Sequence, residues 1–346
     1  MASEVTRRFV IYGAGAIGGV VGAQLHRAGT EVILIARGAH AEAMQRNGIT
    51  LAHGDEAEVF AVPVVTDPAA IDWRADDVVL LTMKSQDTLA AVRALAAAAP
   101  PSIAVVCAQN GVDNERVVLR HFARTYGCVV MMPAAHLEPG VVQAHAWPTP
   151  GLLDVGAYPR GTDATALEIV AAFNNAGFHC VVRDEVMRWK HTKLLMNLAN
   201  AVVALCGSGE ESGDLRRAAR QEGAAVLDAA SIDYASEQED RDRRGDHLTV
   251  VPIKGEYRIG GSTHQSLARG AGSVESDWLN GEIVALGRLY GVATPVNEVL
   301  QRRANAAARA GLAPESVPAR EILEEISWAA SGSGLGEGNP EASPQG

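Results

Sequence analysis

The sequence predicts an α/β protein: a doubly wound parallel sheet in residues 1–183, an all-α domain in residues 184–330 and a disordered tail in residues 331–346. Three observations support this division. A short apolar run near the N-terminus enters a glycine-rich loop, further apolar runs alternate with helical segments, and strand-like patterns disappear after Asp184. Alternating strands and helices form a sheet with helices on both faces, and with a glycine-rich first turn the expected domain is Rossmann-like.

The first strand and the loop after it predict a dinucleotide site. The apolar run 8–12 meets a G-x-G-x-x-G loop, and a helix-like segment follows. In such a loop the glycines allow the tight turn, the approach of the phosphates and the packing of the helix on the strand. Backbone N–H groups at the helix N-terminus then face a pyrophosphate. The candidate cofactor-binding residues are Gly13, Ala14, Gly15, Ala16, Ile17 and Gly18.

The end of the second strand predicts which dinucleotide binds. The apolar run 31–36 leads into Arg37. An NAD enzyme usually has Asp or Glu here, which bonds the ribose 2′-OH. A guanidinium instead binds a 2′-phosphate with charge-assisted hydrogen bonds. We therefore expect NADP(H), although a solvated loop charge is the alternative interpretation of Arg37.

The remaining elements of the first domain follow from the same patterns. Continuous apolar runs are typical of parallel strands buried on both faces. A looser section at residues 50–65 precedes the third strand. Strands are expected at 77–83, 103–107, 128–132, 141–145, 152–155 and 178–182, and helices at 85–98 and 164–175.

Helical periodicity dominates after Asp184. Helices are expected at 186–205, 215–235, 274–290 and 297–311. The charged stretch 236–261 is expected to be a solvated helix end and loop. The last residues are rich in Gly, Ser, Pro and Glu, a composition that favours disorder.

Three polar residues share one face of the first helix of this half. Lys193, Asn197 and Asn200 stand at i, i+4 and i+7 among apolar neighbours. Buried polar groups need partners or a ligand, and desolvation lowers the pKa of a lysine. Lys193 is therefore a candidate general acid. A structural polar seam between the domains explains the same spacing.

Two further polar residues follow strands at the edge where ligands of open α/β sheets bind. Lys84 could reach a cofactor phosphate, and Asn110 offers donors and an acceptor to a nicotinamide amide or a substrate carbonyl. A surface lysine and an ordinary Asn-Gly turn are the alternatives.

Candidates with a more ordinary explanation occur elsewhere in the chain. Glu275 opens a helix, where its charge is favourable, or it bonds a substrate hydroxyl or Lys193. His145 and His191 could act in catalysis, but a packed or exposed histidine is the commoner case.

Bulk properties exclude several classes of function. The chain has 346 residues and a net charge of −11, which argues against nucleic acid or an anionic membrane as the main partner. Its four cysteines stand singly, so we expect neither a disulfide framework nor a metal site. No signal peptide or membrane span is apparent, and a cytoplasmic protein is expected. The sequence leaves a homodimer open.

Taken together, these motifs resemble the ketopantoate reductase (2-dehydropantoate 2-reductase) family from about Phe9 to Ala310. Each motif is weak alone, but their order is specific. In chain order they are G-A-G-A-I-G, Arg37, M-K-S-Q, Q-N-G-V, P-G-V-V-Q-A-H ending at His145, W-K-H-T-K-L-L-M-N-L-A-N, S-T-H-Q-S-L and E-S-D-W-L-N-G.

The resemblance implies NADPH-dependent reduction of a small branched 2-oxo acid, 2-dehydropantoate, to pantoate in coenzyme A biosynthesis. It makes Lys193 the general acid and Glu275 an acidic residue near cofactor and substrate. By position it also implies substrate contacts from Asn110, Asn197, Asn200 and Thr263, and cofactor contacts from Arg37, Lys84, Asn110, Ala135 and Glu275.

The chain departs from the family pattern in its first C-terminal helix. Asn200 follows Asn197 by three residues rather than four, and Ala201 stands where the family has Pro. Two other functions therefore stay open. One is an NADP-dependent dehydrogenase of another small 2-oxo or 2-hydroxy acid, and the other is a nonenzymatic NADP(H)-sensing module that docks a partner protein.

Overall fold

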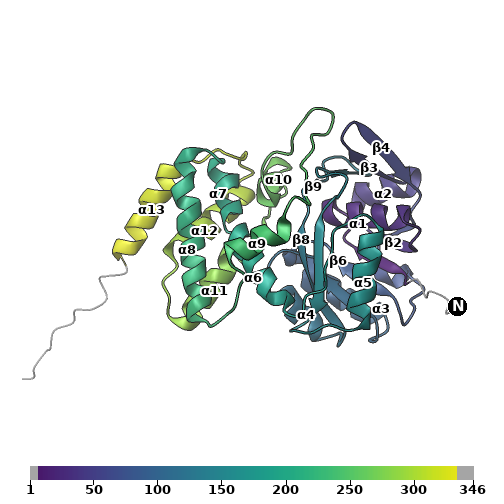
Figure 1. Cartoon of the computed structure of the whole chain (residues 1–346). Coiled ribbons are helices and arrows are strands. Elements are labelled where there is room, and N and C mark those ends of the chain that lie inside the picture. Colours follow the sequence, from purple (N-terminus) through teal and green to yellow (C-terminus); the bar gives the residue numbers. More distant parts are fainter. Residues whose placement is uncertain (1–6, 333–346) are drawn as a thin grey trace, which may run out of the picture. The chain divides into compact units, whose positions relative to one another are not determined.

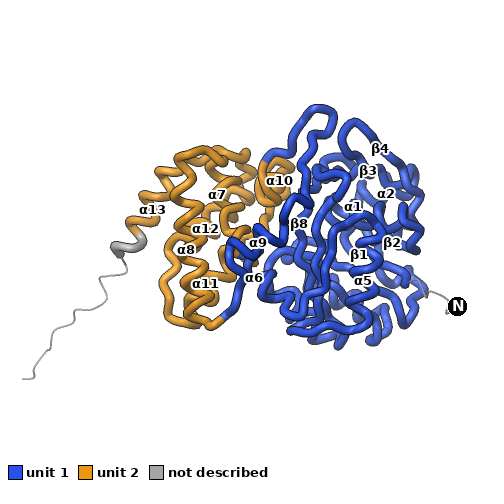
Figure 2. Tube along the Cα trace, viewed as in Figure 1, with its two compact units in different colours: residues 1–194, 232–259 blue, residues 195–231, 260–346 orange. Residues whose placement is uncertain are grey.

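The computed structural model describes residues 7–332 and divides into two compact units (Figures 1 and 2). The sheet unit contains the chain up to residue 194 together with 232–259. The helical unit contains residues 195–231 and the chain from 260 onward. This division differs from the predicted boundary at residue 183, because a helix after that point and a later segment both fasten to the sheet.

A seven-stranded sheet forms the centre of the sheet unit. All neighbouring strands are parallel except β8 and β11, which are antiparallel. Their order across the sheet is β11 (Leu152–Ala157), β8 (Thr125–Met131), β7 (Ala104–Cys107), β6 (Val78–Leu81), β1 (Phe9–Tyr12), β2 (Val32–Ile35) and β5 (Val64–Val65).

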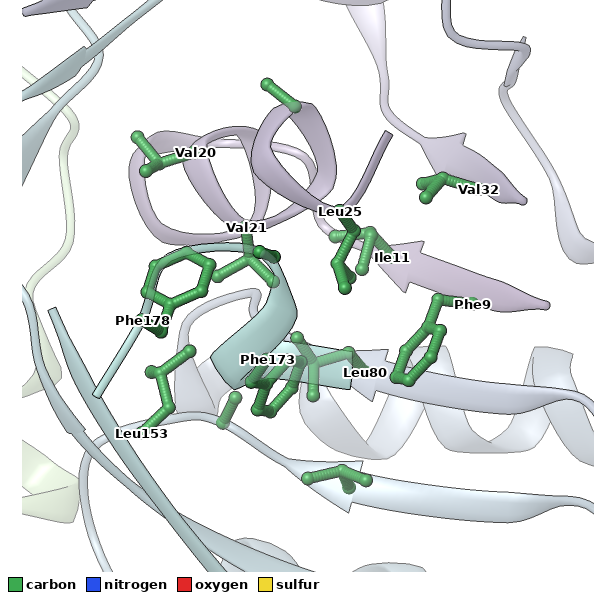
Figure 3. Close-up of a cluster of buried hydrophobic side chains, with 14 of the residues drawn as sticks. Phe9, Ile11, Val20, Val21, Leu25, Val32, Leu80, Leu153, Phe173 and Phe178 are labelled. Atoms are coloured by element: carbon green, nitrogen blue, oxygen red, sulfur yellow. The ribbon is translucent and has the colours of Figure 1, made fainter. Parts of the chain in front are cut away.

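Helices cover both faces of this sheet, as the continuous apolar strands predict. In β1, Phe9 and Ile11 face one core and Val10 faces the other. The first core receives α1 (Ala16–Arg27) and α5 (Ala164–Asn175), and Figure 3 shows Phe173 lying against it. The second receives α3 (Thr88–Ala98) and α4 (Asn114–Leu119).

A second, four-stranded sheet contains residues that the sequence predicted as a looser section. Its order is β4 (Glu56–Phe60), β3 (Ile49–His53), β10 (Val141–Ala144) and β9 (Ala134–Ala135). The strands are short and β4 is largely exposed, so they lack the apolar runs that identify the buried strands. The prediction for residues 50–65 therefore missed a hairpin.

The strand predicted at 178–182 is wrong. This segment makes only isolated bridges to β11. Its backbone does bond β11, because Val155 N donates to Val181 O (3.1 Å) and Arg183 N donates to Val155 O (2.8 Å). Val181 N, however, donates to the side chain of Asp154 (3.3 Å), so the ladder is interrupted between the two bridges.

The charged segment 236–261 is less solvated than predicted. It begins with α9 (Glu237–Arg244), in which Asp240 is buried. Arg243 forms an ion pair with Asp154 of β11. After α9, Val251 N donates to His145 O (2.9 Å) at the end of β10. These contacts explain why the segment belongs to the sheet unit.

Six helices and a 3₁₀ turn, η4 (Glu275–Trp278), account for most of the described helical unit. The helices are α7 (Ala199–Cys206), α8 (Gly213–Ala229), α10 (Ser262–Ala268), α11 (Asn280–Tyr290), α12 (Pro295–Arg309) and α13 (Ala319–Gly332). The predicted helix 274–290 is divided at Leu279, and α8 ends six residues before the predicted end. Of the predicted disordered tail, 331–332 end α13, and 333–346 lie outside the described residues.

The predicted helix 186–205 is two helices. The first, α6 (Val186–Asn197), ends one residue before Leu198, and α7 begins at Ala199. Lys193 and Asn197 are one turn apart on α6, while Asn200 lies on α7, so one uninterrupted helix does not carry all three. Among residues 7–332, no helix combines the length and apolarity that crossing a bilayer requires.

Candidate active site

The glycine-rich loop after β1 has the geometry that a dinucleotide requires. Gly13 has φ +103°, and a Cβ there would lie 2.6 Å from Met83 N. A Cβ on Gly18 would lie 2.3 Å from Thr82 Oγ1, so α1 packs too closely for any side chain. A Cβ on Gly15 would meet nothing within 4 Å. The loop is thus crowded on its protein side and open at its middle glycine, where a ligand approaches.

The N-terminus of α1 is suited to an anion. Its N-cap residue, Gly15, has no side chain to bond the first N–H groups, and the first turn contains no acidic residue. Thr82 Oγ1 donates to Gly13 O (2.8 Å) and fixes the loop from beneath. The positive end of the helix dipole therefore stays uncompensated by protein carboxylates.

His40 also holds this loop, and sequence reasoning did not find it. It lies on α2 (Gly38–Asn47); its Nε2 donates to Ala14 O (2.7 Å), and its Nδ1 accepts from Gly140 N (2.8 Å). Burial and the adjacent His136 lower the pKa of His40. A neutral imidazole thus ties the loop to the turn before β10.

Arg37 stands at the predicted position, directly after β2. It is the N-cap residue of α2, and its side chain is 74% exposed. Its guanidinium lies 3.6 Å from the carboxylate of Asp87. The arginine is accessible to a ligand, but a carboxylate competes for it.

Lys84 and Asn110 follow β6 and β7, and a buried polar network joins their two loops. Thr88 Oγ1 donates to Asn114 Oδ1 (2.8 Å) and accepts from Gln109 Nε2 (2.7 Å). Asn114 Nδ2 in turn donates to Asn110 O (3.0 Å). The loops are therefore fixed relative to each other before any ligand binds.

Lys190 fastens α6 to the same loop and was not predicted. Its ammonium is buried, forms an ion pair with buried Glu115 of α4 and donates to Gln109 O (3.2 Å). Burial raises the pKa of Glu115, although the charge of Lys190 opposes this. The two partners are 75 residues apart in sequence, which left no local signal of the pair.

Lys193, one turn further along α6, is partly buried. Its Nζ lies 3.6 Å from Met131 Sδ at the end of β8. Burial lowers the pKa of Lys193 to about 8. Its thioether neighbour is a weak acceptor, so the ammonium can give up its proton near neutral pH.

The predicted residues that follow strands of the seven-stranded sheet lie along one edge of it. The carboxyl ends of β8, β7, β6, β1 and β2, which are consecutive neighbours, lead to Met131, Asn110, Lys84, the glycine loop and Arg37. Four steps between strands span about 19 Å. Ligands of open α/β sheets bind outside this edge, so the arrangement is suited to an extended ligand with phosphates.

Ala135 belongs to the second sheet. It is buried in β9, where it pairs with Gln143 of β10. The carbonyl of the preceding residue, Ala134, accepts a hydrogen bond from Arg258 Nε (3.2 Å).

The other four predicted residues lie beyond residue 194. Asn197, Thr263 and Glu275 are buried, and Asn200 is partly buried. Within the helical unit, a Cβ on Gly261 would lie 3.0 Å from Asn200 Oδ1. Asn200 therefore faces the start of α10, the helix that carries Thr263.

A buried network supports the interruption between α6 and α7. Asn280 Nδ2 donates to Leu198 O (3.2 Å) and to Asn297 Oδ1 (2.9 Å). Asn297 Nδ2 donates to Glu222 Oε1 (2.8 Å). Burial raises the pKa of Glu222. Asn280 lies in the E-S-D-W-L-N-G motif, but its sequence context predicts no role for it.

Comparison with known families matches most of the chain. The model described as Ketopantoate reductase PanE/ApbA matches residues 9–160, and the one described as Ketopantoate reductase PanE/ApbA C terminal matches residues 185–308. A 2-dehydropantoate 2-reductase of Pyrococcus horikoshii is 28% identical over 301 residues, which are 85% of this chain and 95% of that protein.

Solved structures show the same fold. A PanE/ApbA family ketopantoate reductase from Ralstonia eutropha is 30% identical, with a TM-score of 0.73 over 88% of this chain and 99% of that one. A dimeric ketopantoate reductase from Staphylococcus aureus is 17% identical, with a TM-score of 0.66 over 88% and 99% of the two chains.

Proposed function

The chain belongs to the ketopantoate reductase family, and we propose that it reduces the C2 carbonyl of 2-dehydropantoate to give pantoate, with NADPH as reductant. It is an oxidoreductase of the NADP-dependent type, and its product serves pantothenate biosynthesis. One observation carries the proposal: the carboxyl ends of five neighbouring strands lead to the glycine-rich loop, Arg37, Lys84, Asn110 and Met131, and Met131 contacts Lys193.

The residues along this edge fit NADP(H). The open position at Gly15 and the N-terminus of α1 accept a pyrophosphate. Arg37, at the end of β2, is where a 2′-phosphate is recognised, and its exposed guanidinium can form charge-assisted bonds with it. Bound NADPH supplies the hydride that attacks the carbonyl carbon.

Lys193 is the general acid of this proposal. As the carbonyl carbon is reduced, its oxygen gains negative charge and needs a proton. An ammonium whose pKa is about 8 holds a proton at neutral pH and gives it up readily. Lys190 acts on this step indirectly: its ion pair with Glu115 fixes α6, and so the position from which Lys193 donates.

The amide residues and Glu275 bind and orient the substrate. Asn110 and Asn197 are assigned to the carbonyl, which must be aligned for attack. Asn200 and Thr263 complete the substrate contacts, and Glu275 accepts a hydrogen bond from the distal hydroxyl. These assignments follow the family motifs by position; Asn197, Thr263 and Glu275 are buried in the helical unit.

A panel of 2-oxo acids tests the reaction and its main alternative. Each acid is incubated with the enzyme and NADPH or NADH, and oxidation of the nicotinamide is followed by absorbance. We expect 2-dehydropantoate with NADPH to give the highest kcat/KM. A higher kcat/KM with another 2-oxo acid would assign the chain to that substrate, and tight NADPH binding without turnover on any acid would favour the sensing module.

Replacement of Lys193 tests the proposed acid. Lys193→Ala should lower kcat by about 10²–10⁴-fold, the usual contribution of general acid catalysis. Its affinity for NADPH should stay close to that of the unmodified enzyme. The matched control is Lys254→Ala, which removes an exposed lysine of the same unit. Unchanged turnover in the Lys193 variant would exclude the role.

A homodimer is also proposed. Leu323 and Trp328 of α13 are 39% and 78% exposed and so are available for an apolar contact with a second copy of the chain. The dimeric relative from Staphylococcus aureus supports the same expectation. Sedimentation equilibrium of the purified chain should give twice the monomer mass, and Trp328→Glu should shift the equilibrium toward monomers.

A further inference from the structure

Arg258 of the sheet unit is a partly buried cation without a protein counter-charge. Its Nε donates to Ala134 O (3.2 Å). Among the residues that the structure describes, no carboxylate forms an ion pair with it. Three other arginines of the same unit have one: Arg8 pairs with Asp77, and Arg183 and Arg243 pair with Asp154. Arg124, which is also partly buried, has no carboxylate among the described residues but donates to two oxygens, Ser102 O and Thr165 Oγ1.

The absence of a carboxylate matters because burying a charge without compensation is costly. Burial lowers the pKa of Arg258 but leaves the guanidinium protonated at neutral pH. Within residues 7–332 its one protein acceptor is a carbonyl oxygen, and a guanidinium has five N–H donors. The remaining donors are therefore suited to an anionic ligand with two oxygens in one plane.

The position of Arg258 is fixed by the sheet unit itself. The segment before it is attached to β10 through Val251 N to His145 O (2.9 Å) and to the β3–β4 turn through Lys254 N to Gly54 O (3.1 Å). The hydrogen bond to Ala134 adds a third attachment at the guanidinium. The cation is thus held in place before a ligand arrives.

Arg258 and Lys193 are attached to the same short segment of chain. Lys193 Nζ contacts Met131, and Arg258 Nε contacts Ala134, three residues later. Three residues span at most about 10 Å. The positive charge of Arg258 acts on both Lys193 and His145, and it lowers the pKa of each beyond the larger effect of burial. An anion at Arg258 would therefore be close enough to the proposed acid for their charges to interact.

We propose that Arg258 binds the carboxylate of the 2-oxo acid substrate, and so selects 2-oxo acids over uncharged ketones. This inference rests on the proposed function. In a 2-oxo acid the carboxylate is bonded directly to the carbonyl carbon, so a guanidinium that holds the carboxylate also fixes the oxygen that Lys193 protonates. Arginine forms two parallel hydrogen bonds with a carboxylate, which restrains its rotation.

The test compares an acid with its uncharged counterpart. Arg258→Met should lower kcat/KM for 2-dehydropantoate by about 10²-fold or more, chiefly through KM, as expected for the loss of two charge-assisted hydrogen bonds. For the corresponding 2-oxo amide, kcat/KM should change less than threefold. Lys254→Met, which removes an exposed cation from the same segment, should leave both substrates unaffected.

Two further measurements distinguish a site for the substrate carboxylate from a site for a cofactor phosphate. NADPH affinity, measured by fluorescence titration, should be unchanged in Arg258→Met; a loss of NADPH affinity with an unchanged KM for the acid would mean that Arg258 binds a cofactor phosphate, and would overturn the proposal. Relative to Arg258→Met, Arg258→Lys should recover part of kcat/KM for the acid and leave kcat/KM for the amide unchanged. If Arg258→Met does not fold, the unmodified enzyme still tests the claim, because it must prefer the acid to the amide by a similar factor.

A binding measurement distinguishes failure of the carboxylate site from failure of the proposed function. Oxamate, a carboxylate that NADPH does not reduce, is titrated against the enzyme–NADPH complex by calorimetry. Oxamate binding that Arg258→Met abolishes would support the carboxylate site even if no 2-oxo acid were turned over. Equal oxamate binding by the unmodified enzyme and the variant would overturn it even if 2-dehydropantoate were the substrate.

Discussion

The ammonium nitrogen of Lys193 lies 3.6 Å from the thioether sulfur of Met131, the last residue of β8. A thioether is a weak acceptor, so the contact restores little of the hydration that the ammonium loses. Burial is the largest cause that lowers the pKa of Lys193 to about 8, and Arg244 and Arg258 add to it while Asp240 opposes it. The pKa of the proposed acid therefore follows from its surroundings.

The rate of reduction should depend on this pKa. The acid must be protonated, so kcat for reduction should be constant below about pH 8 and fall about tenfold per pH unit above it. Oxidation of pantoate needs the neutral amine, so its kcat should rise over the same range. Steady-state kinetics at saturating substrates measure both directions. Profiles that run flat through pH 8 in both directions would rule out Lys193 as the titrating acid.

The same lysine should reduce the stability of the fold. Its pKa is about 8 in the folded chain and about 10.5 when unfolded, so the folded state disfavours the proton. Between these values the unfolded state binds more protons, and stability rises with pH. Below about pH 8 the full penalty applies, about 1–3 kcal/mol for this partly buried group.

Lys193→Met should therefore increase the free energy of unfolding by about 1–3 kcal/mol at neutral pH. The gain should disappear as the pH approaches about 10.5, where the lysine is neutral in both states. Urea denaturation at a series of pH values measures it. Lys254→Met, at an exposed site, is the control and should show no such dependence. A loss of stability on Lys193→Met at neutral pH would contradict the argument.

Lys190, three residues before Lys193, should behave in the opposite way. It is buried against Glu115, and removing one member of a buried ion pair leaves the other charge uncompensated. Lys190→Met should lower the free energy of unfolding by about 3–5 kcal/mol. The double variant Lys190→Met, Glu115→Leu should regain most of that loss. Urea denaturation measures both variants, and a double variant at least as unstable as Lys190→Met would falsify the assignment.

The elements that the sequence predicted best are those with a strong local pattern. The helix at 164–175 has the predicted bounds, because Asp163 caps it and its apolar face is regular. The β1–loop–α1 unit was also predicted, because two glycines of the loop, Gly13 and Gly18, stand where a Cβ would clash with the protein. Residues placed by a strand end, such as Arg37 and Lys84, follow directly from this pattern.

The features that were missed depend on partners distant in sequence. Val181 N donates to the side chain of Asp154, so an apolar run that is typical of a strand makes only isolated bridges to β11. Lys190 meets Glu115 across 75 residues. Arg243, in a segment that looks solvated, pairs with Asp154 across 89 residues. None of these contacts leaves a periodic signal in the sequence.

The contact between Arg37 and Asp87 should limit affinity for NADPH. Asp87 lies 3.6 Å from the guanidinium and competes with a 2′-phosphate. Asp87→Asn should tighten NADPH binding by about two- to fivefold, the scale of an exposed ion pair. Arg37→Ala should weaken it about tenfold or more and leave NADH affinity nearly unchanged. Arg46→Ala is the control for charge, because it removes an exposed arginine from α2, the helix whose N-cap residue is Arg37. Equal losses for NADPH and NADH in Arg37→Ala would refute recognition of the 2′-phosphate.

The hydrogen bonds of His40 make the phosphate-binding loop sensitive to acid. Gly140 N donates to Nδ1, and Ala14 O accepts from Nε2, so the ring is neutral with its proton on Nε2. A second proton would have to occupy Nδ1, where it opposes the Gly140 N–H. Burial is the main cause of the lowered pKa of His40, and His136 contributes. Because the folded pKa lies below the unfolded value of about 6.5, the contribution of His40 to stability is present above that pH and is lost as the pH falls through the folded pKa.

His40→Phe keeps an aromatic ring but removes both hydrogen bonds. It should lower the free energy of unfolding by about 1–3 kcal/mol at neutral pH, since Ala14 O and Gly140 N lose their partner. The substitution should also weaken NADPH binding several-fold, because Ala14 belongs to the phosphate-binding loop. Below about pH 6.5, the free energy of unfolding should fall less steeply in this variant than in the unmodified enzyme. Urea denaturation and fluorescence titration with NADPH give the two values. His121→Phe, at an exposed histidine, is the control. An equally steep loss of stability in acid for His40→Phe would show that another group controls the loop.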